Sequence, residues 1–144
     1  MANIKDAHQI LQDAWPEIKR LYAIAMPGKR LMVSEVYREP SRQMDLYKMG
    51  RTKAPNGDWV VTDKKLVVTY VDGYEIVGAH NHLPALAIDV IVVNNSNGAA
   101  DWKEDSYSPL EKIAFGLGLE SGISWSKFKD PQHIQIPNWK ELCQ

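Results

Sequence analysis

The stretch HNHLPALAIDVIVV, residues 80–93, decides the fold of this chain. Its second half, residues 85–93, is the most apolar run of the sequence and has the length of a buried β-strand. Asp89 interrupts that run, and a carboxylate is costly to bury without a partner. We therefore expect a central strand from which Asp89 points toward a bound metal ion.

The segments before this strand alternate between helical and extended patterns. Apolar residues recur at three- and four-residue steps over about the first twenty residues, which predicts an amphipathic helix. Pro16 lies inside this pattern and should break or kink the helix, because proline removes a backbone donor. The apolar run 31–36 predicts a strand that delivers Arg38 at its end, and Ser41 could cap the helix that follows.

The remaining segments complete a mixed fold. An Asp-Gly pair at 72–73 predicts a hairpin over residues 64–78, and the start Ser-Pro-Leu-Glu predicts a helix over 109–117. A short last strand, 134–136, carries His133 at its start. Together these elements predict an α+β fold, a small antiparallel β-sheet with flanking helices.

Composition limits the functions that this chain can have. With 17 basic and 18 acidic residues among 144, the net charge of -1 gives no electrostatic case for a nucleic-acid partner. The length suits one domain, 1–144, without a separate cell-wall-binding domain, and we expect a monomer. No apolar run has the roughly 20 residues that span a bilayer, and the N-terminus does not resemble a signal peptide. Cys143 is the single cysteine, and we expect no catalytic role for it.

Three residues offer the ligands that zinc prefers. His82, Asp89 and His133 would supply two imidazoles and a carboxylate, and a hydrolytic zinc site leaves a fourth position for water. Asp130 stands three residues before His133 and could act as a general base. On spacing alone a second reading stays open, because a histidine is more often a packed or surface residue than a ligand, and Asp before Pro is common in turns.

The sequence around these residues resembles a known family. The segment HNHLPALAID, 80–89, resembles the S-x-H-x-x-G-x-A-x-D signature of the LAS-type zinc peptidases. That family includes D-Ala-D-Ala dipeptidases, D,D-carboxypeptidases and phage endolysins that cut the L-alanyl-D-glutamate bond of peptidoglycan. The resemblance places His82 and Asp89 on the first two zinc ligands, and it implies the fold of the hedgehog and D-Ala-D-Ala peptidases.

Two further blocks extend the resemblance in the right order. The segment GLGLESGISWSKFKDPQHIQ, 116–135, is similar to the endolysin branch and places Asp130 on the catalytic acid and His133 on the third ligand. The segment VSEVYREPSRQMDLYKMGRTKAPNGDWVVT, 33–62, places Arg38 on the site arginine and Gln43 on a motif glutamine. Arg38 would stabilise the developing oxyanion or hold a substrate carboxylate, and its alternative role is a surface ion pair with Glu35 or Glu39. Gln43 would contact substrate.

The chain also departs from the family pattern. His80 stands where the family has Ser, and Ala85 where it has Gly. His80 could replace the Ser beside the metal, contact the peptide substrate, remain solvated, or compete with His82 for zinc. Only His82 keeps the family's spacing to Asp89, so the resemblance favours His82 as the ligand.

The resemblance implies a zinc-dependent peptidoglycan peptidase of phage or prophage origin, made in the cytoplasm and acting at the bacterial cell wall after release. The Asp at position 130 favours the endolysin branch, which cuts an L-alanyl-D-glutamate bond in the stem peptide. Two alternatives remain at this point. One is a D,D-carboxypeptidase or dipeptidase that acts on D-Ala termini, and the other is a non-catalytic zinc-containing domain that binds the wall or a structural partner.

Overall fold

Strand β4 (Ala87–Asn94) lies at the centre of an antiparallel sheet in the computed structural model, which describes residues 2–143. Its neighbours are β1 (Lys29–Glu35) on one side and β7 (Asp130–Gln135) on the other, with β6 (Glu120–Gly122) beyond β7. The short β5 (Ala100–Asp101) pairs with the end of β4. This arrangement confirms the predicted α+β class with a small antiparallel sheet and flanking helices.

Side chains of β4 alternate between the two faces of the sheet. Ile88, Val90 and Val92 are fully buried in the core, whereas Asp89 projects from the opposite face, since successive residues of a strand point to opposite sides. In register, Asp89 pairs with Glu35 of β1 and with His133 of β7. Three polar side chains from three adjacent strands therefore meet at one point of the sheet.

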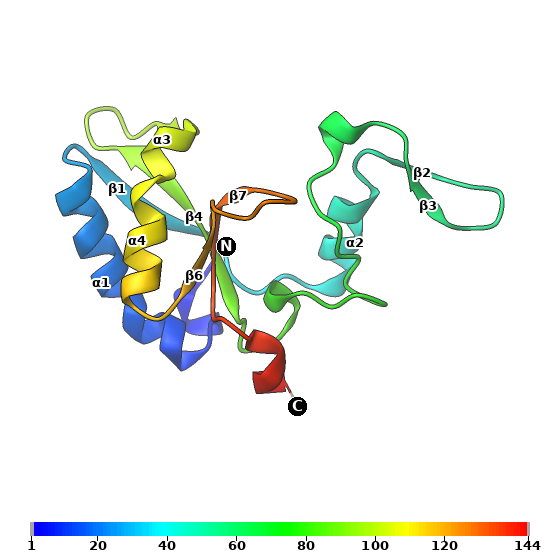
Figure 1. The fold of residues 1–144 in the computed structure, drawn as a ribbon, viewed down its shortest axis with the longest axis horizontal. Helices are drawn as coiled ribbons and strands as arrows, with labels where there is room; N and C mark the ends of the chain where they lie inside the picture. The colour runs from blue at the N-terminus through cyan, green and yellow to red at the C-terminus, as the bar shows by residue number, and fades with distance from the viewer. Residues whose placement is uncertain (1, 144) are drawn as a thin grey trace.

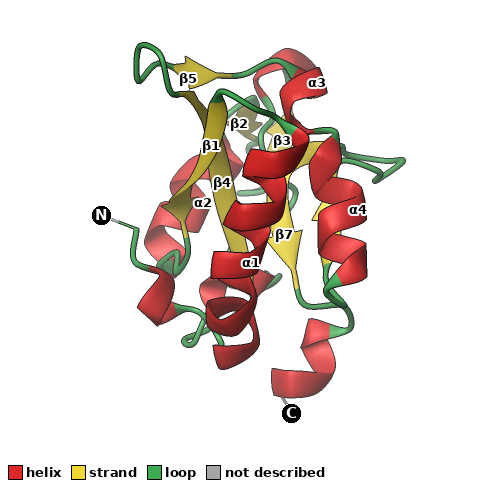
Figure 2. Ribbon diagram, turned by 90° about the vertical axis from the view of Figure 1, so that its left-hand side faces the viewer, coloured by secondary structure: helices red, strands yellow, loops and turns green. Residues whose placement is uncertain are grey.

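Two helices pack on the apolar face of the sheet, and Figure 2 shows them side by side in front of the strands. Helix α1 (Gln9–Ala25) buries one stripe, and α4 (Pro109–Gly116) lies beside it after the short α3 (Glu104–Tyr107). The buried residues of α1 recur at helical spacing and are Leu11, Trp15, Ile18 and Tyr22. The predicted helix over 109–117 is thus confirmed.

Helix α1 continues through Pro16, so the expected break is wrong. Proline there removes the backbone bond to the carbonyl of Gln12. Pro16 lies on the exposed face of α1, where water can solvate that carbonyl, while Trp15 and Ile18 are held in the core. Packing of the apolar stripe therefore outweighs the loss of one helical hydrogen bond.

A second lobe stands to one side of the sheet, as Figure 1 shows. It contains α2 (Pro40–Lys48) and the ribbon of β2 (Arg51–Lys53) and β3 (Trp59–Val61). Two single-turn helices, η2 (Lys64–Leu66) and η3 (Ala79–Asn81), bound the irregular segment that returns the chain to β4.

The predicted hairpin over residues 64–78 does not form. The carboxylate of Asp72 accepts hydrogen bonds from the amides of Tyr74 and Ile76, both at 2.9 Å, so the side chain takes donors that a strand ladder would need. Gly73 has φ of +87°, and an added Cβ would lie 2.9 Å from Cβ of Gln43. The turn is therefore pressed against α2 rather than extended as a ribbon.

The chain ends in η4 (Trp139–Cys143), a closing helical turn, and begins with η1 (Ile4–Asp6). Among the described residues, no helix is long and apolar enough to cross a membrane.

An ion pair between Lys29 of β1 and Asp101 of β5, which also bonds to Ser106 of α3, gives a test of the fold. Asp101 accepts hydrogen bonds from Lys29 Nζ, the Lys103 amide and Ser106 Oγ, and these contacts hold the pKa of Asp101 below its usual range. Because the folded-state pKa is lowered, the stabilisation is present above the unfolded-state pKa of about 3.9 and is lost as the pH falls. We expect Asp101→Asn to lower the melting temperature at neutral pH, with the difference from wild type shrinking below about pH 4.

Glu104→Gln is the matched control for this measurement. Its ion pair with Lys129 joins side chains that are 53% and 54% exposed, so its removal should scarcely change melting. A constant difference between Asp101→Asn and wild type from neutral to acid pH would contradict the assignment.

Candidate metal centre

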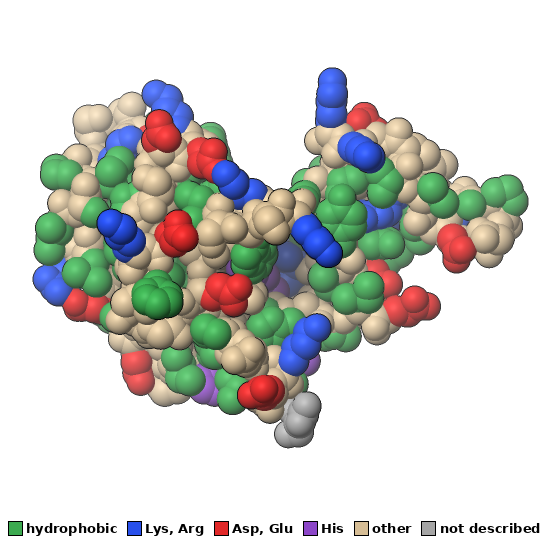
Figure 3. Space-filling view, viewed as in Figure 1, with side chains coloured by type: hydrophobic (Ala, Val, Ile, Leu, Met, Phe, Trp, Pro, Cys, Tyr) green, Lys and Arg blue, Asp and Glu red, His purple; other side chains and the backbone are tan. Residues whose placement is uncertain are grey.

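A cleft of about 610 Å³ lies between the polar face of the sheet and the second lobe. Figure 3 shows the hollow between the two halves of the molecule. Its wall on the sheet side carries Trp125, Phe128 and Asp130, and its opposite wall is the segment 67–71. Tyr70 and Phe128 meet edge to face with ring centroids 5.4 Å apart, so an aromatic contact joins the two walls.

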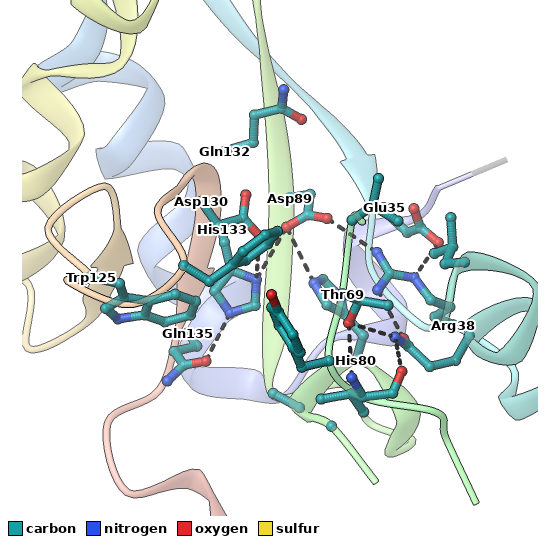
Figure 4. Close-up of a pocket in the computed structure, with 18 of the residues that line it drawn as sticks. Glu35, Arg38, Thr69, His80, Asp89, Trp125, Asp130, Gln132, His133 and Gln135 are labelled. Carbon is teal, nitrogen blue, oxygen red and sulfur yellow. Dashed lines mark hydrogen bonds and ion pairs between the residues drawn. The ribbon is translucent and has the colours of Figure 1, made fainter. Parts of the chain in front are cut away.

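Three potential metal ligands converge in this cleft. His80, Asp89 and His133 each offer one ligand atom, and these atoms all lie within 4.8 Å of one another. His80 Nε2 and His133 Nδ1 both lie 3.2 Å from Oδ1 of Asp89, as the dashed lines in Figure 4 show. Two imidazole nitrogens and one carboxylate oxygen form a donor set that suits Zn²⁺.

Neighbouring groups decide which nitrogen each imidazole offers. His80 Nδ1 lies 2.7 Å from the carbonyl oxygen of Val36, which can only accept, so Nδ1 donates, and in the neutral ring Nε2 carries the lone pair that faces Asp89. His133 presents the other nitrogen, Nδ1, to Asp89, and its Nε2 lies 2.8 Å from Oε1 of Gln135. In the neutral rings both lone pairs therefore face the same carboxylate, a position that either a shared proton or a metal ion can bridge.

His82 is not part of this group, contrary to the expectation from family spacing. It follows η3 and lies against Trp139, with ring centroids 5.5 Å apart. His80 instead stands in η3, where the amide of Arg38 bonds to its carbonyl and its own ring bonds to Val36. Both histidines precede Asp89 in an irregular connection, and in such a connection the number of residues does not determine which side chain reaches the strand.

Asp89 carries its negative charge in a largely enclosed place, with a side chain only 16% exposed. Burial alone would raise the pKa of Asp89, but the charges and hydrogen bonds of His80 and His133 hold it far below its usual range. His133 shows the complementary effect: burial would lower its pKa, and the hydrogen bond to Asp89 raises it. The cluster thus favours an ionised Asp89.

Arg38 lines the cleft beside the ligands, and its side chain is 12% exposed. Its guanidinium donates to Asp89 Oδ2 at 3.2 Å, to Glu35 Oε1 at 2.7 Å and to Gln43 Oε1 at 2.9 Å. Burial would lower the pKa of Arg38, but the hydrogen bond and charge of Glu35, followed by the charge of Asp89, raise it. The expected alternative of an ion pair with Glu35 is present, but it is mostly enclosed and points into the site.

Gln43 is almost fully buried, at 2% exposure, and its amide is engaged within the protein. Its oxygen accepts from Arg38, and its nitrogen donates to Thr69 Oγ1 and to the carbonyl of Val71. Gln43 therefore fixes Arg38 against the segment that forms the far wall. This holding role was not foreseen from the sequence, and the predicted substrate contact stays a prediction.

Asp130 lies at the start of β7 with its carboxylate toward the ligands and 37% of its side chain exposed. Its Oδ2 is 4.0 Å from His133 Nδ1. Burial, followed by the negative charge of Asp89, raises the pKa of Asp130, while His133, His80 and Arg38 act in the opposite direction. A carboxylate with these neighbours holds a proton more readily than a free one, as proton transfer requires.

Some residues of the site were missed in the sequence. Gln135 could have been found from strand alternation, because it lies two residues from His133 along β7 and so shares that residue's face. Glu35 could not, because the register of β1 shifts between Val33, which pairs with Val90 of the core, and Glu35, which pairs with Asp89. Thr69 carried no such signal, because the segment around it has no regular structure.

Comparison with known proteins gives two likenesses. The peptidoglycan L-alanyl-D-glutamate endopeptidase CwlK of Bacillus subtilis (strain 168) is 33% identical over an alignment of 147 positions, gaps included, that covers 92% of this chain and 75% of that protein. The crystal structure of the Serratia marcescens L-Ala D-Glu endopeptidase ChiX superposes with a TM-score of 0.57, at 19% identity, over 99% of this chain and 88% of that chain. The second likeness concerns the fold alone. No family model matches the chain.

The two nearby histidines provide a direct test of the metal centre. We expect His80→Ala to abolish stoichiometric zinc binding, because it removes one of three converging donors, and His82→Ala to retain about one zinc per chain. Zinc is measured by elemental analysis after repletion and gel filtration, with melting curves to confirm folding. Loss of zinc in His82→Ala but not in His80→Ala would instead support the ligand set expected from family spacing.

Proposed function

Because this chain belongs to the LAS-type peptidases, the family of the peptidoglycan L-alanyl-D-glutamate endopeptidases, we propose that it is a zinc-dependent hydrolase that cuts that bond in the stem peptide of peptidoglycan. The observation that carries the proposal is the convergence of His80, Asp89 and His133 in a cleft that also contains Asp130 and Arg38. This set supplies both a metal site and groups for proton transfer and charge stabilisation.

We assign His80, Asp89 and His133 as the zinc ligands. A zinc ion held there would supply Lewis acidity, which polarises a carbonyl group and lowers the pKa of water. The rest of the reaction falls to the side chains around it.

Asp130 is the proposed general base and acid. It is the one carboxylate of the cluster that is neither in the proposed ligand set nor paired with Arg38 by a hydrogen bond, and more than a third of its side chain faces solvent in the cleft. It accepts a proton from the attacking water and delivers it to the amine that leaves. Its pKa, raised by burial and by Asp89, suits both directions of transfer.

Arg38 is proposed to stabilise negative charge at the scissile carbonyl. A guanidinium has five N–H donors, and three of them are used by Asp89, Glu35 and Gln43. The other two donors form no hydrogen bond within residues 2–143 and are proposed to meet the oxyanion, and the three existing bonds fix the group before substrate arrives.

Purified sacculi give the test of bond specificity. Zinc-loaded protein is incubated with sacculi, and the new peptide termini are identified by mass spectrometry. New N-terminal D-glutamate would support the proposal. Release of D-Ala would indicate a D,D-carboxypeptidase, and an absence of new termini with zinc bound would indicate a non-catalytic domain.

Asp130→Asn should keep the fold and the zinc but lose activity by about 10²- to 10⁴-fold, because the amide cannot accept a proton. Turnover on sacculi is the measurement, and zinc content and melting are recorded for the same preparation. Asp45→Asn on the exposed surface of α2 is the control and should keep wild-type turnover. Equal turnover in Asp130→Asn and wild type would remove the base assignment.

Arg38→Lys should lower kcat/KM by about ten-fold or more, although it conserves charge, because an ammonium cannot reproduce the planar set of donors. Arg42→Lys, an exposed arginine of the same lobe, should have no such effect. Zinc content is measured in both variants, because Arg38 also bonds to Asp89. Wild-type kinetics in Arg38→Lys would leave Arg38 as a structural residue.

A further inference from the structure

A series of hydrogen-bonded side chains outside the ligand set ends on His133. The His133 Nε2 lies 2.8 Å from Gln135 Oε1, and Gln135 Nε2 donates to Glu120 Oε2 at 3.2 Å. Trp125 Nε1 donates to the other oxygen of Glu120 at 3.0 Å. Glu120, Trp125 and Gln135 are neither proposed zinc ligands nor the groups proposed for proton transfer and oxyanion stabilisation.

The direction of the hydrogen bonds in this series follows from Glu120, the residue farthest from His133 along it. A carboxylate only accepts, so Glu120 requires the NH₂ group of Gln135 to face it. The amide oxygen of Gln135 is then left to face His133, and an amide oxygen also only accepts. His133 must therefore carry a proton on Nε2, and in the neutral ring this leaves the lone pair on Nδ1, the atom that faces Asp89.

Strand pairing holds these hydrogen-bonded side chains in place. Glu120 and Gln135 are direct cross-strand partners on β6 and β7, and Asp89 and His133 are partners on β4 and β7. Alternation along β7 puts His133 and Gln135 on one face. The ring of Trp125 also lies 5.0 Å from the ring of His133, so the residue that anchors Glu120 also packs on the imidazole.

We propose that Glu120 and Gln135 are positioning residues that fix the tautomer of His133, so that Nδ1 is the nitrogen offered to the metal. The proposal rests on the proposed zinc site and deepens it. Hydrogen-bond partners of ligand histidines typically contribute 10- to 100-fold in metal affinity. A purely structural cross-strand pair would affect melting and leave both tautomer and affinity unchanged.

The central comparison is between two glutamines of the same strand. Gln135→Leu removes the acceptor of His133 Nε2, whereas Gln132→Leu changes a glutamine that lines the cleft and, as Figure 4 shows, points away from the imidazole. Zinc dissociation constants are measured by competition with a chelator. We expect zinc binding about 10- to 100-fold weaker in Gln135→Leu and unchanged in Gln132→Leu.

An exchange of the pair separates hydrogen-bond polarity from packing. In the double variant Glu120→Gln with Gln135→Glu, the carboxylate lies beside His133 and the amide behind it, so the group that faces His133 still accepts, while the hydrogen bond between positions 120 and 135 reverses its direction. We expect this variant to bind zinc within about three-fold of wild type, because the Nε2 proton keeps its acceptor. The variant also serves if Gln135→Leu does not fold.

The tautomer itself is read from nitrogen-15 spectra of the metal-free protein in alkaline buffer. A proton on Nε2 in wild type and in the exchanged pair supports the proposal. A proton on Nδ1 in wild type overturns it, as does equal zinc affinity in Gln135→Leu and Gln132→Leu or a failure of the exchanged pair to bind zinc. Failure of wild type to bind zinc while Nε2 is protonated would instead count against the proposed function alone.

Discussion

The placement of Asp89 in the middle of the most apolar strand is the constraint on which the rest of the site depends. Alternation along β4 puts Ile88 and Val90 in the core and leaves the Asp89 carboxylate on the opposite face, 16% exposed. A carboxylate so enclosed must be paired, and His80, His133 and Arg38 each come within 3.2 Å of it. Each partner comes from a different segment: His133 from β7, His80 from η3 and Arg38 from the residues after β1. The charge of Asp89 therefore connects these three segments.

Every partner of Asp89 is in turn held by a group behind it. Arg38 is fixed by Glu35 and Gln43, His80 by the carbonyl of Val36, and His133 by Gln135. No buried side-chain nitrogen or oxygen in residues 2–143 lacks a hydrogen-bond partner. A site with fixed partners needs little reorganisation when charge develops, and this is the property that makes electrostatic catalysis effective.

The sequence predicted those parts of the structure that depend on local pattern. The central strand, the helix from Pro109 and the antiparallel class follow from periodicity and capping, and Asp89 and His133 meet because both lie on strands. The failures occurred where tertiary contacts compete with local preference. Core packing carries α1 through Pro16, the Asp72 side chain replaces a strand ladder, and the irregular connection before β4 brings His80 rather than His82 to Asp89.

The two walls of the cleft differ in how they contribute to stability, and this bears on specificity. The sheet wall is continuous with the buried core, whereas the stretch 66–76, which contains the facing wall, exposes Leu66, Tyr70, Tyr74 and Ile76, each more than half exposed. The Arg51 guanidinium lies over the Tyr70 ring, 5.2 Å from its centroid, and Phe128 meets the same ring edge to face across the cleft, so this wall is held by a few contacts rather than by a core. Residues on such a wall can change with little loss of fold stability, while the ligands on the sheet cannot. Substrate selection is therefore expected to reside in the exposed wall of the second lobe, and the chemistry at the polar face of the sheet, where His80 and Arg38 meet Asp89.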